Sequence, residues 1–233
     1  MRYVPIAAAA LACLIASSAS AASFVSGPGS IYLDKADDFS WTATLSASAG
    51  SGLAGTTGSI VYNFLSANAA GTVWNFSYSV DNTSTAPSAG SELSSFGFDT
   101  SGLASSVSTG MGNTFKGVVQ AGNFNGLGGR QLCFYAGPNC NGGASNGVSA
   151  IASPVGGSFA ITFASGVSAI TVDDFVARWQ STGPNQQGSA SGTGVVTAPV
   201  PEPATWMMMM LGFGAVGYAM RKRSVRFGRR QVI

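Results

Sequence analysis

The residues that most often carry enzyme chemistry are scarce in this chain. It contains no histidine among its 233 residues, which excludes histidine general bases, Ser-His-Asp triads and most transition-metal sites. A Gly-x-Ser-x-Gly pattern occurs at residues 143–147, but a serine elbow needs a strand-to-helix turn and a histidine partner. Here the pattern lies in a Gly- and Asn-rich stretch, so we expect no catalytic serine and no enzyme activity.

Carboxylates are the remaining groups for acid-base chemistry or for a hard metal ion. Glycoside hydrolysis requires two of them flanking a sugar, about 5 to 10 Å apart. Most carboxylates here fall in expected turns or at strand ends, which argues against a glycosidase. Calcium is an alternative, with ligands from Asp34, Asp37 and Asp38 or from the pair Asp173 and Asp174. No EF-hand or nonapeptide repeat surrounds them, so we assign no metal site and keep calcium as an alternative.

A second group of residues points to ligand binding rather than catalysis. The candidate ligand-binding residues are Asp173, Asp174, Arg178 and Trp179. On a strand, Arg178 and Gln180 share one face and Trp179 takes the other. An exposed tryptophan can stack on a sugar ring, which would suit a lectin-like module. The alternative is that Trp179 fills the core opposite Trp41 and Trp74.

Two cysteines lie close together in the sequence Cys133-Phe-Tyr-Ala-Gly-Pro-Asn-Cys140. Cysteines this close usually pair in an oxidising compartment, and closing the loop stabilises the fold by about 2.5 kcal/mol on the chain-entropy model. A zinc site is the alternative, but two thiols without histidine are half of a zinc ligand set. We therefore predict a Cys133–Cys140 disulfide.

Hydrophobic periodicity predicts the elements that must position these residues. Period-two alternation, typical of half-buried strands, is clearest over residues 72–80, where Trp74, Phe76, Tyr78 and Val80 share one face. Further strands are expected at residues 31–33, 39–45, 59–65, 95–99, 114–120, 158–163, 169–180 and 189–196, and regular structure is expected to lapse between 122 and 157. No segment of this part shows helical periodicity. The sequence therefore predicts an all-β protein with a single antiparallel, jelly-roll-like β-sandwich.

The N-terminal residues and the charge distribution indicate an exported protein. Arg2, an apolar run over residues 6–15 and the small residues 19–21 predict a signal peptide covering residues 1–21. The β-sandwich domain is then expected over residues 22–197. Four basic and eight acidic residues between positions 22 and 200 give this body a net charge of −4. The sequence therefore predicts no binding to nucleic acid.

The C-terminal residues 198–233 have three successive parts. A Pro-rich stalk comes first, then an apolar segment at residues 204–220, and then a basic tail at residues 221–233. A helix over 205–220 would measure about 24 Å, slightly less than the hydrocarbon core of a bilayer, so we expect one short transmembrane helix. Because positive charge is retained in the cytoplasm, the body would lie on the outer side. An ordinary C-terminal anchor is one explanation of this arrangement.

A sorting signal is the other explanation. Pro201, Glu202, Pro203, Trp206, Arg221, Lys222 and Arg223 carry the pattern. It resembles the PEP-CTERM signal of Gram-negative bacteria in its Pro-Glu-Pro-x-x-Trp variant. The resemblance implies recognition and cleavage near Pro-Glu-Pro by an exosortase, a membrane protease. Residues 97–99, 133–143 and 173–194 also resemble the cistern subgroup of PEP-CTERM proteins.

Together these features lead to an expected function and location. We expect a protein exported across the inner membrane, anchored transiently by its C-terminus, and then placed on the outer surface or outside the cell. The expected role is structural or adhesive within an exopolysaccharide or biofilm layer, with extracellular polysaccharide as a partner. The alternative is a carbohydrate- or calcium-binding module. No cofactor is expected apart from the calcium of that alternative.

Overall fold

The computed structural model describes residues 23–124, 126–141, 146–198, 209–214, 216–217 and 221. The chain forms two compact units, Met1–Ala198 and Pro199–Ile233, and each is described by itself. The predicted signal peptide, residues 1–21, lies outside the described residues. All of the expected ligand-binding and disulfide residues belong to the first unit.

The first unit is built from strands. They are β1 (Phe24–Gly27), β2 (Ser30–Asp34), β3 (Phe39–Gly50), β4 (Thr57–Ala67), β5 (Val73–Asp81), β6 (Glu92–Thr100), β7 (Ala104–Thr109), β8 (Lys116–Asn123), β9 (Gly129–Tyr135), β10 (Val148–Ser149), β11 (Val155–Phe163), β12 (Ala169–Thr182) and β13 (Gly188–Thr197). Every pairing between them is antiparallel. The predicted all-β, antiparallel class is confirmed.

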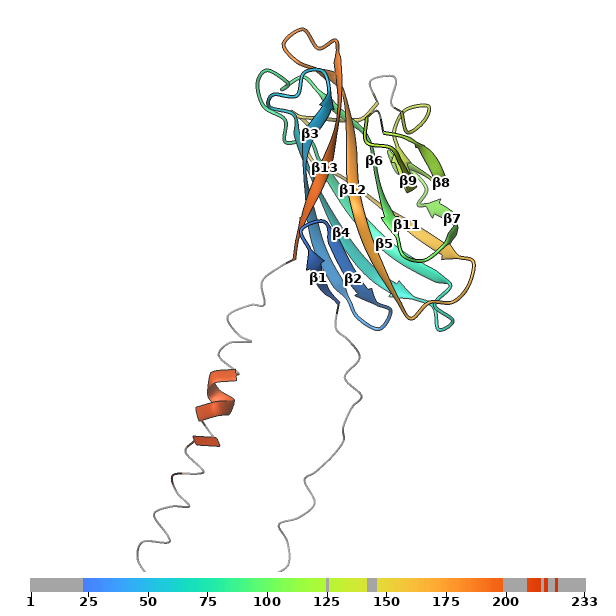
Figure 1. Ribbon diagram of the computed structural model, residues 1–233, viewed down its shortest axis with the longest axis vertical. Helices are drawn as coiled ribbons and strands as arrows, with labels where there is room; N and C mark the ends of the chain where they lie inside the picture. The colour runs from blue at the N-terminus through green and yellow to red at the C-terminus, as the bar shows by residue number, and fades with distance from the viewer. Residues whose placement is uncertain are drawn as a thin grey trace, which may run out of the picture. The chain divides into compact units, whose positions relative to one another are not determined.

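One continuous sheet forms both layers of the fold. Its strand order is β7-β11-β5-β4-β3-β13-β12-β6-β9-β8, and β1, β2 and β10 pair beside this path. Figure 1 shows β3, β13, β12 and β6 side by side. The two end strands approach each other, since a Cβ on Gly117 of β8 would lie 3.0 Å from Val107 of β7. The sandwich is therefore one sheet that nearly closes into a barrel.

Aromatic side chains fill the space that the sheet encloses. In β5 the predicted alternation is confirmed, because Trp74, Phe76, Tyr78 and Val80 are all buried. The rings contact one another across strands, with a centroid distance of 4.6 Å between Phe134 and Phe159. A cross-strand aromatic pair of this kind contributes about 0.5 to 1.5 kcal/mol beyond area burial. The core is therefore a continuous set of ring contacts.

The region between residues 122 and 157 departs from the sequence-based expectation. We expected regular structure to lapse there, and that was wrong, because β9 and β10 form and β9 pairs with both β6 and β8. In β9 three consecutive side chains, Leu132, Cys133 and Phe134, are all buried. Leu132 and Phe134 belong to the main core and Cys133 to a second cluster on the other side. A strand buried on both faces shows no period-two alternation.

The second unit contains helical residues at 209–214, 216–217 and 221. Within the described residues no helix is both long and apolar enough to cross a bilayer. Of the transmembrane helix expected at residues 204–220, residues 204–208, 215 and 218–220 lie outside the described residues. A spanning helix therefore stays a prediction.

Candidate functional site

The outer side of β6, β9 and β12 carries a small second core. We use "outer side" for the face of the sheet opposite the aromatic core. Phe124, Cys133, Cys140 and Val176 form this cluster, with part-buried apolar side chains packed against it. The Phe124 ring lies over Gly97 of β6, where an added Cβ would come within 2.9 Å of the ring. The chain after β8 and the chain after β9 therefore cover this part of the sheet.

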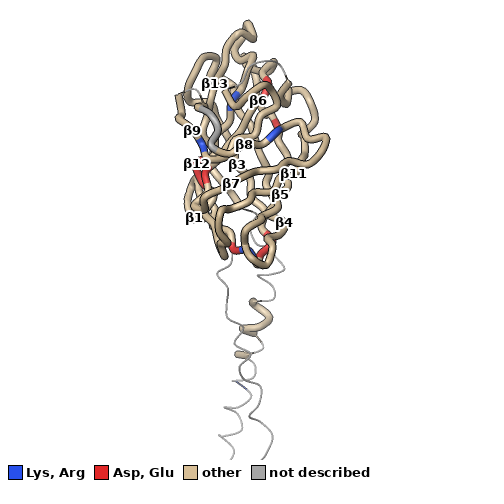
Figure 2. The backbone as a smooth tube through the Cα atoms, turned by 90° about the vertical axis from the view of Figure 1, so that its right-hand side faces the viewer, with Lys and Arg blue, Asp and Glu red and all other residues tan. Residues whose placement is uncertain are grey.

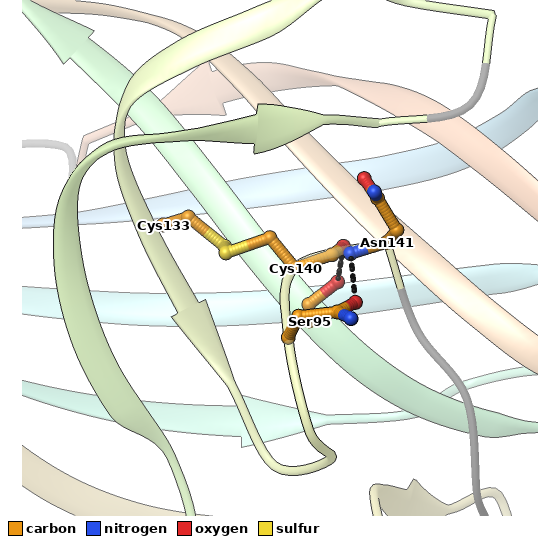
Figure 3. Close-up of a disulfide and its surroundings, with 5 residues drawn as sticks. Ser95, Cys133, Cys140 and Asn141 are labelled. Carbon is orange, nitrogen blue, oxygen red and sulfur yellow. Dashed lines mark hydrogen bonds between the residues drawn. A yellow bond between two sulfur atoms is a disulfide. The ribbon is translucent and has the colours of Figure 1, made fainter.

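The predicted disulfide between Cys133 and Cys140 is confirmed, and it fastens the covering chain (Figure 3). The two Cα atoms lie 6.2 Å apart. The hydroxyl of Ser95 in β6 donates to the Cys140 carbonyl oxygen at 2.9 Å. At the same turn the Asn141 amide donates to the Asn139 side-chain oxygen at 2.9 Å. The disulfide thus holds the loop to β9, and the buried hydrogen bond from Ser95 holds it to β6.

Asp173 and Asp174 lie at a bulge in β12. The register of β12 against β6 shifts between Asp173 and Val176, and Asp174 has a φ of 51°, in the left-handed region that aspartate tolerates. The Arg130 side chain crosses from β9, and its Nε donates to the Asp174 carbonyl oxygen at 2.8 Å. The same Nε lies 4.0 Å from a carboxylate oxygen of Asp99. Figure 2 shows acidic and basic residues together beside β12.

The electrostatics of this corner favour a structural role. Burial raises the pKa of Asp173, and the charges of Asp174 and Asp99 raise it further, while Arg130 lowers it. Arg130 thus lies beside the Asp99 carboxylate and acts on Asp173, and Asp99 also accepts the Gln131 backbone amide. Sequence analysis found Asp173 and Asp174 but missed Arg130 and Asp99, because β9 was not expected. The corner ties β9 to β6 and β12.

Arg178 and Trp179 occupy opposite sides of β12. Trp179 is fully buried in the aromatic core, so it cannot present its ring to a sugar on the surface. The expectation that Trp179 stacks on a sugar is therefore corrected, and its alternative role in the core is what the structure shows. Arg178 lies on the outer side. Among the described residues the ion pair found joins Arg130 to Asp99, so Arg178 has no ion-pair partner there.

The candidate calcium residues serve in turns. Asp37 accepts the backbone amide of Ser23 at 2.7 Å, and Asp34 accepts the amide of Ala36 at 2.9 Å. Among the described residues, no group of three or more acidic or cysteine side chains is arranged to hold a metal ion. The geometry of these aspartates is that of turn and strand-end hydrogen bonding.

Few of the predicted sorting residues can be placed. Pro201, Glu202, Pro203, Trp206, Lys222 and Arg223 lie outside the described residues, and Arg221 is helical. The described part of the second unit is apolar and exposed, with Met209, Leu211 and Phe213 each more than half exposed. Every residue that the structure describes in this unit is exposed.

The comparisons with known proteins concern this second unit. The chain as a whole is an antiparallel β-domain with a disulfide-fastened outer loop, followed by a short unit of different character. Residues 199–224 match the PEP-CTERM protein-sorting motif. The chain therefore carries a PEP-CTERM sorting motif, and the motif indicates export and exosortase sorting towards the cell surface. No curated protein and no solved structure matches it.

Proposed function

We propose that the β-domain is a structural or adhesive component of the extracellular matrix, delivered by its sorting tail. The sorting motif at residues 199–224 carries this proposal, because it directs the protein to the cell surface. Cleavage near Pro201–Pro203 would separate the domain from the tail. We also propose that the protein belongs to the cistern subgroup, which it resembles at residues 133–143, in the loop that the disulfide fastens.

The surface of the domain supports a matrix role. The outward residues of β3, β4 and β5 are mostly short and uncharged, for example Thr42, Thr44, Asn63, Ser77 and Ser79. Asn63 and Ser77 are joined by a hydrogen bond of 3.1 Å between their side chains. Hydroxyl and amide groups can bond the hydroxyls of a polysaccharide, and a surface with few charges repels neither neutral nor acidic chains.

The domain is proposed to have no enzyme activity. The absence of histidine in the sequence and the local hydrogen bonds that the carboxylates of Asp34, Asp37 and Asp99 accept support this. The second candidate function is that of a carbohydrate-binding module. It is favoured by buried polar atoms near Arg178 that have no hydrogen-bond partner. Calcium binding has less support, because Arg130 already lies at the aspartate corner.

Deletion and complementation in the native host test the proposal. We expect deletion to weaken cell-to-surface attachment or to lower the mass of retained matrix, and the full-length chain to restore it. A variant with Glu202→Ala and Pro203→Ala should reach the membrane but fail to restore the matrix. If the deletion strain retains matrix and attaches as the parent does, the structural role is contradicted.

A further inference from the structure

Arg178 is a buried cation that has no anionic partner among the residues the structure describes. Only 8% of its surface is exposed, and its Nε is hidden from solvent and has no hydrogen-bond partner in the described part of the chain. Its Nη1 and Nη2 donate to the hydroxyls of Ser191 and Ser189 at the long distances of 3.4 and 3.3 Å. Burial lowers the pKa of Arg178. A buried guanidinium with so few acceptors is costly to the folded state.

Glu92 is a second charged group with an unmet hydrogen bond on the same side of the sheet. Its Oε2 is hidden from solvent and has no hydrogen-bond partner among the described residues. In the register of β6 and β12, Leu93 lies opposite Trp179, and both point into the core. The neighbouring residues, Glu92 opposite Gln180, therefore point to the outer side. Arg178 lies two residues from Gln180 and shares that side.

The strand register thus places opposite charges in adjacent rows. One row runs Glu92, Gln180 and Ser189 across β6, β12 and β13, and the next runs Ser95, Arg178 and Ser191. The hydrogen bond from Arg178 to Ser189 shows that its side chain reaches the first row. Yet Glu92 and Arg178 are not within ion-pair distance of each other. Each keeps one hidden polar atom, an acceptor on Glu92 and a donor on Arg178.

We propose that Glu92, Gln180, Arg178 and Ser189 form a binding site for a neutral, hydroxyl-rich saccharide. One sugar hydroxyl would donate to Glu92 Oε2 and a neighbouring hydroxyl would accept from Arg178 Nε. The two charges cancel, so the site favours a ligand that carries both donors and acceptors and no net charge. Gln180 and Ser189 are half-buried and form the approach, and their side chains must turn aside for a ligand to reach the hidden atoms.

This inference rests on the second candidate function and gives it a site. It differs from the sequence-based expectation, since Trp179 takes no part and Glu92 replaces Asp173 and Asp174. Arg130 gives an internal contrast, because its Nε and Nη1 have carbonyl acceptors and Asp99 lies nearby. Of these two arginines, Arg178 is therefore the one whose Nε is available to donate to a ligand.

Titration calorimetry of the exported protein with neutral trisaccharides of glucose, mannose and galactose tests the proposal. We expect at least one to bind, and Glu92→Gln and Arg178→Gln each to weaken it about tenfold or more, as for the loss of a hydrogen bond to a charged group. Arg130→Gln is the matched control and should change affinity by less than about twofold. Circular dichroism checks that each variant is folded.

Three results would overturn the site. The first is no binding by any of the trisaccharides at about 10 mM. The second is equal binding by the wild type and both variants. The third is binding confined to a uronate trisaccharide, which would indicate an oxyanion site at Arg178.

Thermal unfolding adds an independent readout. Glu92→Gln should raise Tm, because it removes the charge of a half-buried carboxylate whose Oε2 is hidden from solvent, whereas a direct Glu92–Arg178 ion pair in solution would make the same variant lower it. If these tests contradict the saccharide site, the proposed matrix role is unaffected, because deletion tests it separately.

Discussion

The two units of this chain carry information in different ways. Among the described residues, the β-domain holds 34 buried hydrophobic residues, 33 of them in two clusters, so its properties depend on side chains brought together from distant positions. The C-terminal unit is recognised from a contiguous run of 26 residues, 199–224. The signal for the protein's destination therefore lies in one short stretch of sequence, whereas any activity at that destination depends on the fold. Substitutions in the two units should therefore have separable effects.

The largest separable effect is expected in the sorting motif. Glu202→Ala combined with Pro203→Ala should lower release of the protein from the membrane by about tenfold or more, because it removes the residues that the exosortase is expected to recognise. The stability of the β-domain should not change. Immunoblots of medium and membrane fractions measure release. Unchanged release would mean that the Pro-Glu-Pro is only a spacer.

A core substitution should have the opposite pattern. Phe134→Ala is expected to lower the free energy of unfolding by about 3 to 5 kcal/mol, because the ring is fully buried and its removal leaves a cavity among Phe96, Phe98 and Phe159. Urea denaturation followed by tryptophan fluorescence measures the loss. Phe213→Ala, at a side chain 70% exposed in the second unit, is the matched control and should leave the transition unchanged. A shared loss would show that the two units unfold together.

Removal of the disulfide should have a smaller effect. Cys133→Ser is expected to lower the free energy of unfolding by about 2.5 kcal/mol, and only under oxidising conditions. In reductant the wild type and the variant should unfold at nearly the same urea concentration. An equal difference in reductant would mean that the lost packing of Cys133 in the outer cluster, rather than the covalent bond, provides the stability.

The smallest effect concerns pH. The raised pKa of Asp173 means that the folded state holds its proton more tightly than the unfolded state, so this group favours folding below its ordinary pKa of 3.8. That contribution is lost as the pH rises through the raised pKa. Asp173→Asn should therefore raise stability at neutral pH by about a few tenths of a kcal/mol, since the group is only part-buried and solvent screens its charge. A lower stability at neutral pH would mean that the carboxylate makes a favourable contact with Arg130.

Sequence analysis predicted much of the fold because most strands have one buried face. The alternation in β5, from Trp74 to Val80, marks both the strand and its inward side. Strand β9 was missed because Leu132, Cys133 and Phe134 are buried on both sides. Strand β7 was missed because its sequence, Ala-Ser-Ser-Val-Ser-Thr, contains one large apolar residue. The order of the strands depends on contacts between distant residues, which periodicity does not encode.

The residues of the proposed saccharide site show the same limit. Arg178 stood out in the sequence as a charged residue beside a tryptophan, and the alternation of β12 correctly separated it from Trp179. Glu92 carried no such signal, because it lies 86 residues earlier and its proximity follows only from the β6–β12 register. The sorting motif needed no structure, since its residues are contiguous.

The most direct test of exosortase sorting is the intact mass of the protein recovered from the medium and from the membranes of its native host. Signal-peptide cleavage and exosortase cleavage together predict a released form that lacks residues 1 to about 21 and everything after about Pro203. That result would identify the β-domain as the unit that acts outside the cell. A membrane form that still carries Arg221 and the rest of the basic tail, with no released form, would contradict sorting and indicate a permanent anchor.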